Sequence, residues 1–88
     1  MTNPRSIRPD VRNPIMALPD AVAALQALPN DSRQALRVVL LAIRQNAAER
    51  AEMSWRKHKA PMAAYWKAVA VYAGHIARLV RDQEVGNG

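Results

Sequence analysis

Apolar residues recur at alternating intervals of three and four along the C-terminal half of the chain. This spacing places them on one face of a helix and is typical of knobs-into-holes packing. One such row carries mostly large side chains: Met62, Tyr65, Val69, Tyr72, Ile76 and Leu79. A second row beside it is rich in alanine: Ala63, Trp66, Ala70, Ala73, Ala77 and Val80. We predict a helix over about 61–83 whose Tyr72 row packs within the fold and whose alanine-rich row stays open for another contact.

A second apolar stripe predicts a preceding helix over about 31–58. Asn30 and Asp31 are good helix-start residues, and Asp31 lies three positions before Gln34, the spacing of a capping box. Val38 and Leu41 fall outside the stripe and suggest a second contact surface. The stripe itself has six members: Leu36, Val39, Leu40, Ile43, Ala47 and Ala51.

The N-terminal third predicts a short helix and an extended arm. Pro19 suits the first turn of a helix over about 19–28, and Pro29 ends it. Residues 1–15 contain Asn-Pro twice and read as an extended or flexible basic arm, because a residue before proline favours extended backbone angles. The predicted organisation is the arm, a single helical domain over 16–84, and a flexible tail over 85–88.

Pro61 allows two connections between the long helices. An antiparallel hairpin with its turn near residue 59 brings Glu52 towards Lys67 and Arg37 towards Asp82, so that opposite charges meet. Against it, the linker at 57–60 has no glycine to end a helix, and the apolar row continues in phase through Pro61. The alternative is one proline-kinked helix that buries its faces in an oligomer. We predict the all-α hairpin.

Composition agrees with a small helical protein. The chain has 88 residues, of which 50% are hydrophobic; 17 are alanine, and none is cysteine or phenylalanine. The lack of cysteine excludes disulfides and thiolate metal sites and fits the cytoplasm. We expect no secretory signal, because the N-terminus has no apolar stretch of the kind such signals need. We expect no membrane span, because Lys67, His75 and Arg78 interrupt the most apolar window.

A net charge of +6 raises the question of an acidic partner. Cations can neutralise phosphates, and aromatic rings can stack on bases. The segment 50–67 combines cations with aromatic residues, and the arm adds three arginines. The candidate contacts to nucleic acid or to an acidic partner are Arg5, Arg8, Arg12, Arg50, Arg56, Lys57, Lys59 and Lys67.

Residues for enzyme chemistry are sparse. His58 lies among lysines, and in the hairpin His75 should lie near Arg44, which disfavours metal binding by either ring. The sequence has no metal-ligand motif, no glycine-rich phosphate loop and no paired nucleophile and base. We therefore predict a non-enzymatic protein, and assign no catalytic, cofactor-binding or metal-binding residue.

The apolar surplus favours a protein-binding module of the accessory, adaptor or inhibitor type. A lone monomer rarely exposes large apolar patches, so we expect docking on a larger protein and self-association as a homodimer. A basic nucleic-acid-binding protein is the alternative, and a subunit that orders only within an assembly is a third reading. The predicted partner-binding residues are Val38, Leu41, Trp55, Tyr65, Trp66, Ala70 and Ala73.

Overall fold

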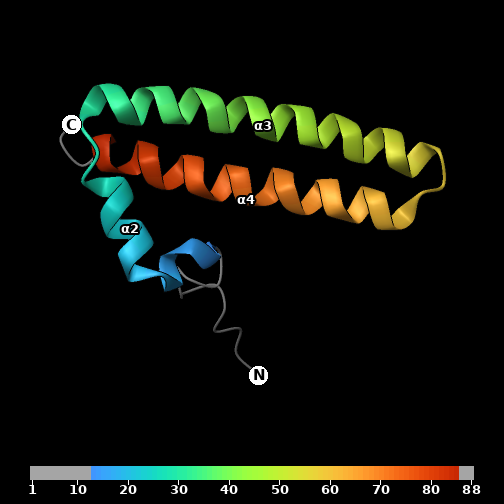
Figure 1. The fold of residues 1–88 in the computed structure, drawn as a ribbon, viewed down its shortest axis with the longest axis horizontal. Coiled ribbons are helices and arrows are strands. Elements are labelled where there is room, and N and C mark those ends of the chain that lie inside the picture. The colour runs from blue at the N-terminus through green and yellow to red at the C-terminus, as the bar shows by residue number, and fades with distance from the viewer. Residues whose placement is uncertain (1–12, 86–88) are drawn as a thin grey trace.

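The computed structural model describes the backbone of residues 13–85 and the side chains of residues 13–80. Four helical elements and no strand make up this part of the chain. A 3-10 turn, η2 (Pro14–Ala17), is followed by α2 (Pro19–Gln26), α3 (Asn30–Arg56) and α4 (Ala60–Val85) (Figure 1). The three predicted helices are confirmed, with ends within about two residues of those expected. No helix in the described part combines the length and the hydropathy needed to cross a membrane.

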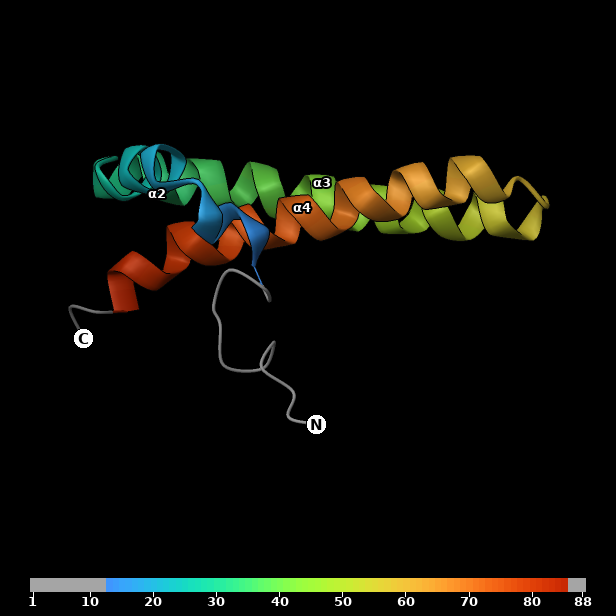
Figure 2. The ribbon, with the colours of Figure 1, turned by 90° about the horizontal axis from the view of Figure 1, so that it is seen from below.

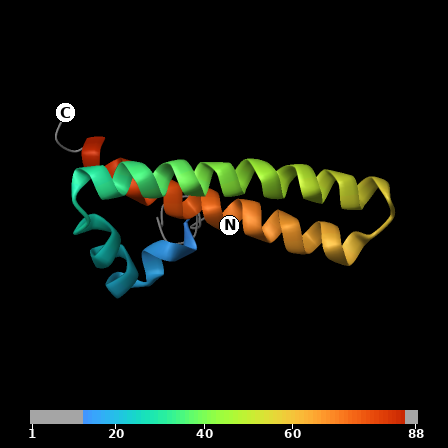
Figure 3. The ribbon, with the colours of Figure 1, turned by 45° about the horizontal axis from the view of Figure 1, so that its top comes forward.

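The two long helices form an antiparallel hairpin. They run side by side in Figure 1, and the turned views show that they cross instead of running strictly parallel (Figures 2 and 3). The single proline-kinked helix is therefore wrong for this chain. Pro61 lies in the first turn of α4, where a missing backbone N–H costs nothing, and not in the interior of a helix.

His58 takes the position after the end of α3 that glycine usually occupies, and the sequence has no glycine there. Its φ of 60° lies in the left-handed region. Its backbone N–H donates to the carbonyl of Trp55 at 3.0 Å, and that of Lys59 donates to the carbonyl of Ser54 at 2.8 Å. This pair of bonds is the Schellman arrangement that usually has glycine at the left-handed position. Histidine is one of the few other residues that enter this region with some frequency.

The predicted capping box at the start of α3 is wrong. The capping position falls on Pro29, whose carbonyl accepts from the Arg33 N–H at 2.9 Å. Asn30 does not cap; its Oδ1 accepts from Arg33 Nη2 at 3.4 Å. Asp31 lies in the first turn, where its charge still suits the helix dipole.

The alanine-rich row of α4, and not the Tyr72 row, packs against α3. Ala47 of α3 is 1% exposed, and four alanines of α4 are buried with it: Ala63, Ala70, Ala73 and Ala77. Small side chains let two helix axes approach closely, which larger residues at these positions would prevent. The larger core side chains gather at the open end of the hairpin, where Leu40 and Val80 are buried. The predicted pairing of the Tyr72 row with α3 is therefore corrected.

The elements η2 and α2 cover the C-terminal part of the Tyr72 row. Leu25 of α2 and Ile76 of α4 pack on the core, and Leu79 is buried. Asn13 is also buried: its Nδ2 donates to the carbonyl of His75 at 3.0 Å, and its Oδ1 accepts from the Ile15 N–H at 3.1 Å. Residues 13–15, expected in the extended arm, thus belong to the helical domain. Residues 1–12 of the predicted arm and 86–88 of the predicted tail lie outside the described residues.

The structure forms no ion pair between Glu52 and Lys67, one of the two charge pairs that the hairpin prediction expected. Glu52 and Lys67 line the same groove, but the carboxylate of Glu52 pairs with Arg56 of its own helix at 3.9 Å. Such an exposed pair adds little stability. The side chain of Asp82 lies outside the described residues, so its pairing with Arg37 stays a prediction.

Candidate functional site

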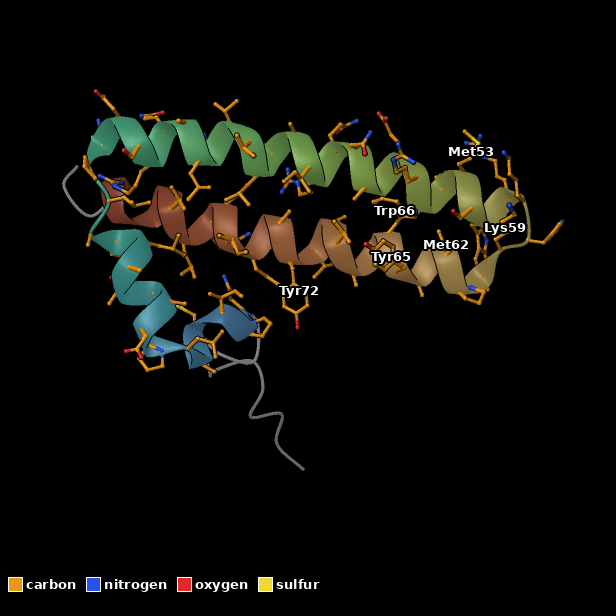
Figure 4. All side chains as sticks on the ribbon, in the orientation of Figure 1. Met53, Lys59, Met62, Tyr65, Trp66 and Tyr72 are labelled. Carbon is orange, nitrogen blue, oxygen red and sulfur yellow. The ribbon has the colours of Figure 1, made fainter. Side chains whose placement is uncertain are left out.

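Large apolar side chains remain exposed on one side of the hairpin, which we call the aromatic face. It consists of the exposed Met53 from α3, of the exposed Met62, Tyr65 and Tyr72 from α4, and of Trp66 from α4, which is half-buried (Figure 4). Tyr65 is 58% exposed and Tyr72 is 48% exposed. These residues stay uncovered because α4 turns its alanines towards α3, while α2 and η2 reach only its C-terminal part.

Three side chains of this region hold one another in place. The guanidinium carbon of Arg50 lies 5.0 Å from the centre of the Trp66 ring. The rings of Tyr65 and Trp66 meet edge to face, with centroids 5.0 Å apart. Arg50 is fixed further by its Nε, which donates to Oδ1 of Asn46 at 3.0 Å. The cluster therefore presents a cation and two aromatic rings in a defined arrangement.

A hollow of about 440 Å³ lies beside this cluster, towards the turn. Arg50, Lys57 and Lys59 supply three cations to its lining, and Trp66 supplies an aromatic ring. Of the described residues that line it, Glu49 is the one with a carboxylate. The hollow can therefore attract an anionic group beside an aromatic surface.

The opposite side of the hairpin carries a larger groove of about 850 Å³, which we call the alanine groove. Its floor is made of short side chains from both long helices, among them Ala48, Ala51 and Ala64. Trp55, which is 65% exposed, stands at the end near the turn. Its other lining residues include Arg44, Glu52, Lys67, Val71, His75 and Arg78.

Arginines gather at the end of the alanine groove that is remote from the turn. Arg44 crosses Gly74 there, with its Cδ 3.1 Å from the place where a Cβ would stand on that glycine. A smaller hollow of about 170 Å³ adjoins this end and is lined by Arg37, Arg44 and Arg78. Among the side chains that the structure describes, no carboxylate lines the smaller hollow.

The predicted partner-binding residues separate into exposed and buried groups. Tyr65 and Trp66 belong to the aromatic face, whereas Trp55 belongs to the alanine groove, so the two tryptophans serve different surfaces. Ala70 and Ala73 are 8% and 5% exposed because they pack against α3. They cannot form the free surface that the sequence suggested, although Ala70 reaches the groove floor.

The remaining two predicted contacts also differ. Val38 is 67% exposed, and it lines none of the hollows described above. Leu41 is half-buried against the core and borders the smaller hollow.

The predicted basic cluster is not one surface. Arg50, Lys57 and Lys59 surround the hollow beside the aromatic face, while Lys67 lines the alanine groove. Arg56 pairs with Glu52. The arm residues Arg5, Arg8 and Arg12 lie outside the described residues.

Sequence reasoning missed the arginine group formed by Arg37, Arg44 and Arg78. Arg78 lies far from the other two in the chain and joins them only through the hairpin register. A signal was present, because Arg37 and Arg44 are seven residues apart on one helix face and the hairpin places Arg78 opposite them. Arg33 was missed as well; its role is structural, since its Nε donates to the Leu28 carbonyl at 3.2 Å and its Nη1 donates to the Val80 carbonyl at 3.3 Å.

The two histidines are placed apart. His58 is in the turn, whereas His75 lines the alanine groove with Arg44, as expected, and its ring lies 6.0 Å from that of Tyr72. Among the residues that the structure describes, no three histidine or carboxylate side chains are grouped to hold a metal ion.

Comparison of the chain with protein-family models, with curated proteins and with solved structures finds no match in any of the three.

Proposed function

We propose that this chain is a non-enzymatic, cytoplasmic protein-binding module that docks on a larger protein through its aromatic face. The observation that carries the proposal is the ordered cluster of Arg50, Tyr65 and Trp66 on an exposed apolar surface. Arginine, tyrosine and tryptophan are the residue types that dominate the binding energy of protein interfaces. The absence of cysteine fits a reducing compartment.

The arrangement of the cluster favours tight binding. Side chains that are already held by their neighbours lose less rotamer freedom when a partner covers them. Met53 and Met62 extend the apolar surface from Trp66 towards the turn (Figure 4), and methionine adapts its shape to different partners. Tyr72 lengthens the surface along α4. A partner that covers this face would remove several large apolar side chains from water.

Self-association is part of the proposal, with the same face as the contact. A second copy could lay its own Tyr65 and Tyr72 against the first. The net charge of +6 opposes such pairing, so it should strengthen when salt screens the repulsion. Light scattering over a dilution series at two salt concentrations measures this association.

The experiment that tests docking compares three immobilised chains in a cell extract treated with nuclease. The wild type and Val38→Ser should retain the same protein, because Val38 is exposed away from the aromatic face. Tyr65→Ser should lose most of that protein. Equal retention by all three chains would remove the aromatic face from consideration. A wild type that stays monomeric and retains no protein would overturn the proposed function.

A second candidate function is nucleic-acid binding. It is favoured by the hollow that Arg50, Lys57 and Lys59 line together with Trp66, since cations would meet phosphates and the indole could stack on a base. Its test is titration of random duplex and single-stranded DNA. Log affinity should fall by about 0.9 for each duplex phosphate contact per tenfold rise in salt. No binding at low salt would exclude this candidate.

A further inference from the structure

We infer that the alanine groove binds an acidic amphipathic helix from a partner protein. The inference rests on the proposed function, to which it adds a second docking surface and the chemistry of its occupant. Its grounds are the shape of the groove, the placement of unpaired cations along it and the basic character of the whole chain.

The floor of the groove suits a helix. Ala48 and Ala51 of α3 and Ala60, Ala63 and Ala64 of α4 present only methyl groups, so the backbone of a third helix can approach closely. The lining of α4 extends from Ala60 to Arg78, which at about 1.5 Å per residue is a length of about 27 Å. An occupying helix of about five turns would match it. Its own large apolar side chains would fill the space left by the alanines.

The charges of the groove select an acidic partner. Arg44, Lys67 and Arg78 line it, and among the described side chains Glu52 is the one carboxylate beside them. The Glu52 carboxylate lies 3.9 Å from Arg56 of its own helix, and the three groove cations form no ion pair within the described part of the chain. Arg37 adds a further cation at the adjoining hollow. Aspartate or glutamate side chains on the flanks of a bound helix could pair with these cations, and the arginine guanidinium groups can donate two hydrogen bonds to one carboxylate in bidentate geometry.

Two other occupants fit the groove less well. A second copy of this chain carries a net charge of +6 and would bring more cations to the arginine end. A nucleic acid would satisfy the cations and could stack a base on Trp55 at the turn end, but the alanine methyl groups along the rest of the floor offer its polar base edges no hydrogen bonds. The combination of an apolar floor and a cationic border is that of a helix-in-groove site for an acidic protein segment.

The test selects binders from a displayed library of helix-forming peptides of about 18 residues, with all positions varied. Wild-type protein should enrich peptides with apolar residues at helical spacing and with Asp or Glu beside them. Two further readouts then locate the bound peptide.

Matched variants provide the first readout. Ala64→Trp fills the groove from an exposed position, whereas Ala68→Trp adds the same side chain at an exposed position that lines none of the hollows. We expect Ala64→Trp to weaken peptide binding at least about tenfold, a difference of about 1.4 kcal/mol, and Ala68→Trp to leave it unchanged. Arg78→Glu should weaken it similarly, and Lys57→Glu, on the other side, should not. Circular dichroism confirms that each variant is helical.

Fluorescence provides the second readout. In Trp66→Phe, Trp55 is the remaining tryptophan, and its emission should shift to shorter wavelength when a peptide covers it. Selected peptides that bind the Ala64→Trp protein as well as the wild type, but bind the Tyr65→Ser protein poorly, occupy the aromatic face. That result would overturn the inference and keep the proposed function. Enrichment of basic peptides would overturn the inference as well. A library that yields no binder to either face would overturn both.

Discussion

Arg44 lies across Gly74, with its Cδ at 3.1 Å from the position of a missing Cβ. The glycine therefore does two things in the middle of α4. It weakens the helix, because glycine is the least favourable helix residue apart from proline, and it makes room for the arginine on the wall of the groove.

We expect Gly74→Ala to stabilise the protein and to move Arg44. The gain in helix propensity is about 1 kcal/mol, and the neighbour that must shift is an exposed, flexible side chain. Urea denaturation should show a higher midpoint at an unchanged m-value. Binding of groove-selected peptides should weaken at the same time. A variant that is less stable than the wild type would show that Arg44 cannot move aside.

His58→Gly should also stabilise the fold. Left-handed backbone costs a residue with a Cβ about 1–2 kcal/mol, of which the greater freedom of unfolded glycine cancels part. The expected net gain is about 0.5–1 kcal/mol, or a rise in Tm of about 2–8 °C for a domain of this size. His58→Ala is the control, and it should not raise the Tm because alanine keeps the Cβ. Equal melting of both variants would contradict the left-handed turn.

Enlarging an alanine between the helices should be far more damaging than enlarging one outside. Ala47 is 1% exposed, so Ala47→Leu forces extra carbon atoms into a filled space between the helices. Overpacking of this kind costs about 1–3 kcal/mol. Ala68→Leu adds the same atoms on the exposed surface and should change the free energy of unfolding by less than about 0.5 kcal/mol. Denaturant unfolding of the two variants distinguishes packing through the alanines from packing through the Tyr72 row. Equal stability would favour the latter.

Arg33 should be one of the least replaceable polar side chains. It is 8% exposed and joins three segments through the carbonyls of Leu28 and Val80 and the amide of Asn30. Arg33→Met keeps much of the stem but leaves those acceptors without their donor, at a cost of about 1–3 kcal/mol. Arg33→Lys should not restore the stability, because one ammonium lacks the fork geometry of the guanidinium. Thermal melting followed by circular dichroism measures both effects.

Sequence spacing was enough for the number of helices and for the hairpin, but not for the face that packs. Both rows of α4 repeat at three and four residues, so periodicity could not choose between Tyr72 and Ala73. The alanine-rich row packs against α3 because it lets the two helix axes approach closely. That approach depends on how the alanines of α3, above all Ala47, meet those of α4. Spacing along a single helix does not contain that information.

The candidate site was predictable only where its residues are neighbours in the chain. Tyr65 and Trp66 are adjacent and were singled out together. The arginines of the groove come from two different helices of the hairpin, and the stacking of Arg50 on Trp66 also joins two helices. The helix end at His58 was not predicted for a different reason. The left-handed backbone that ends a helix is usually that of a glycine, and here histidine adopts it.

The core is concentrated at one end of the hairpin, and this should make local opening uneven. Leu40, Val80, Leu25 and Ile76 gather at the open end, while the half near the turn is held together mainly by alanines. Amide hydrogens of residues near Met53 and Met62 should therefore exchange with solvent faster than those near Leu40 and Ala77. The part of the molecule that carries the aromatic cluster is then also the part that opens most readily, and a bound partner should slow its exchange the most.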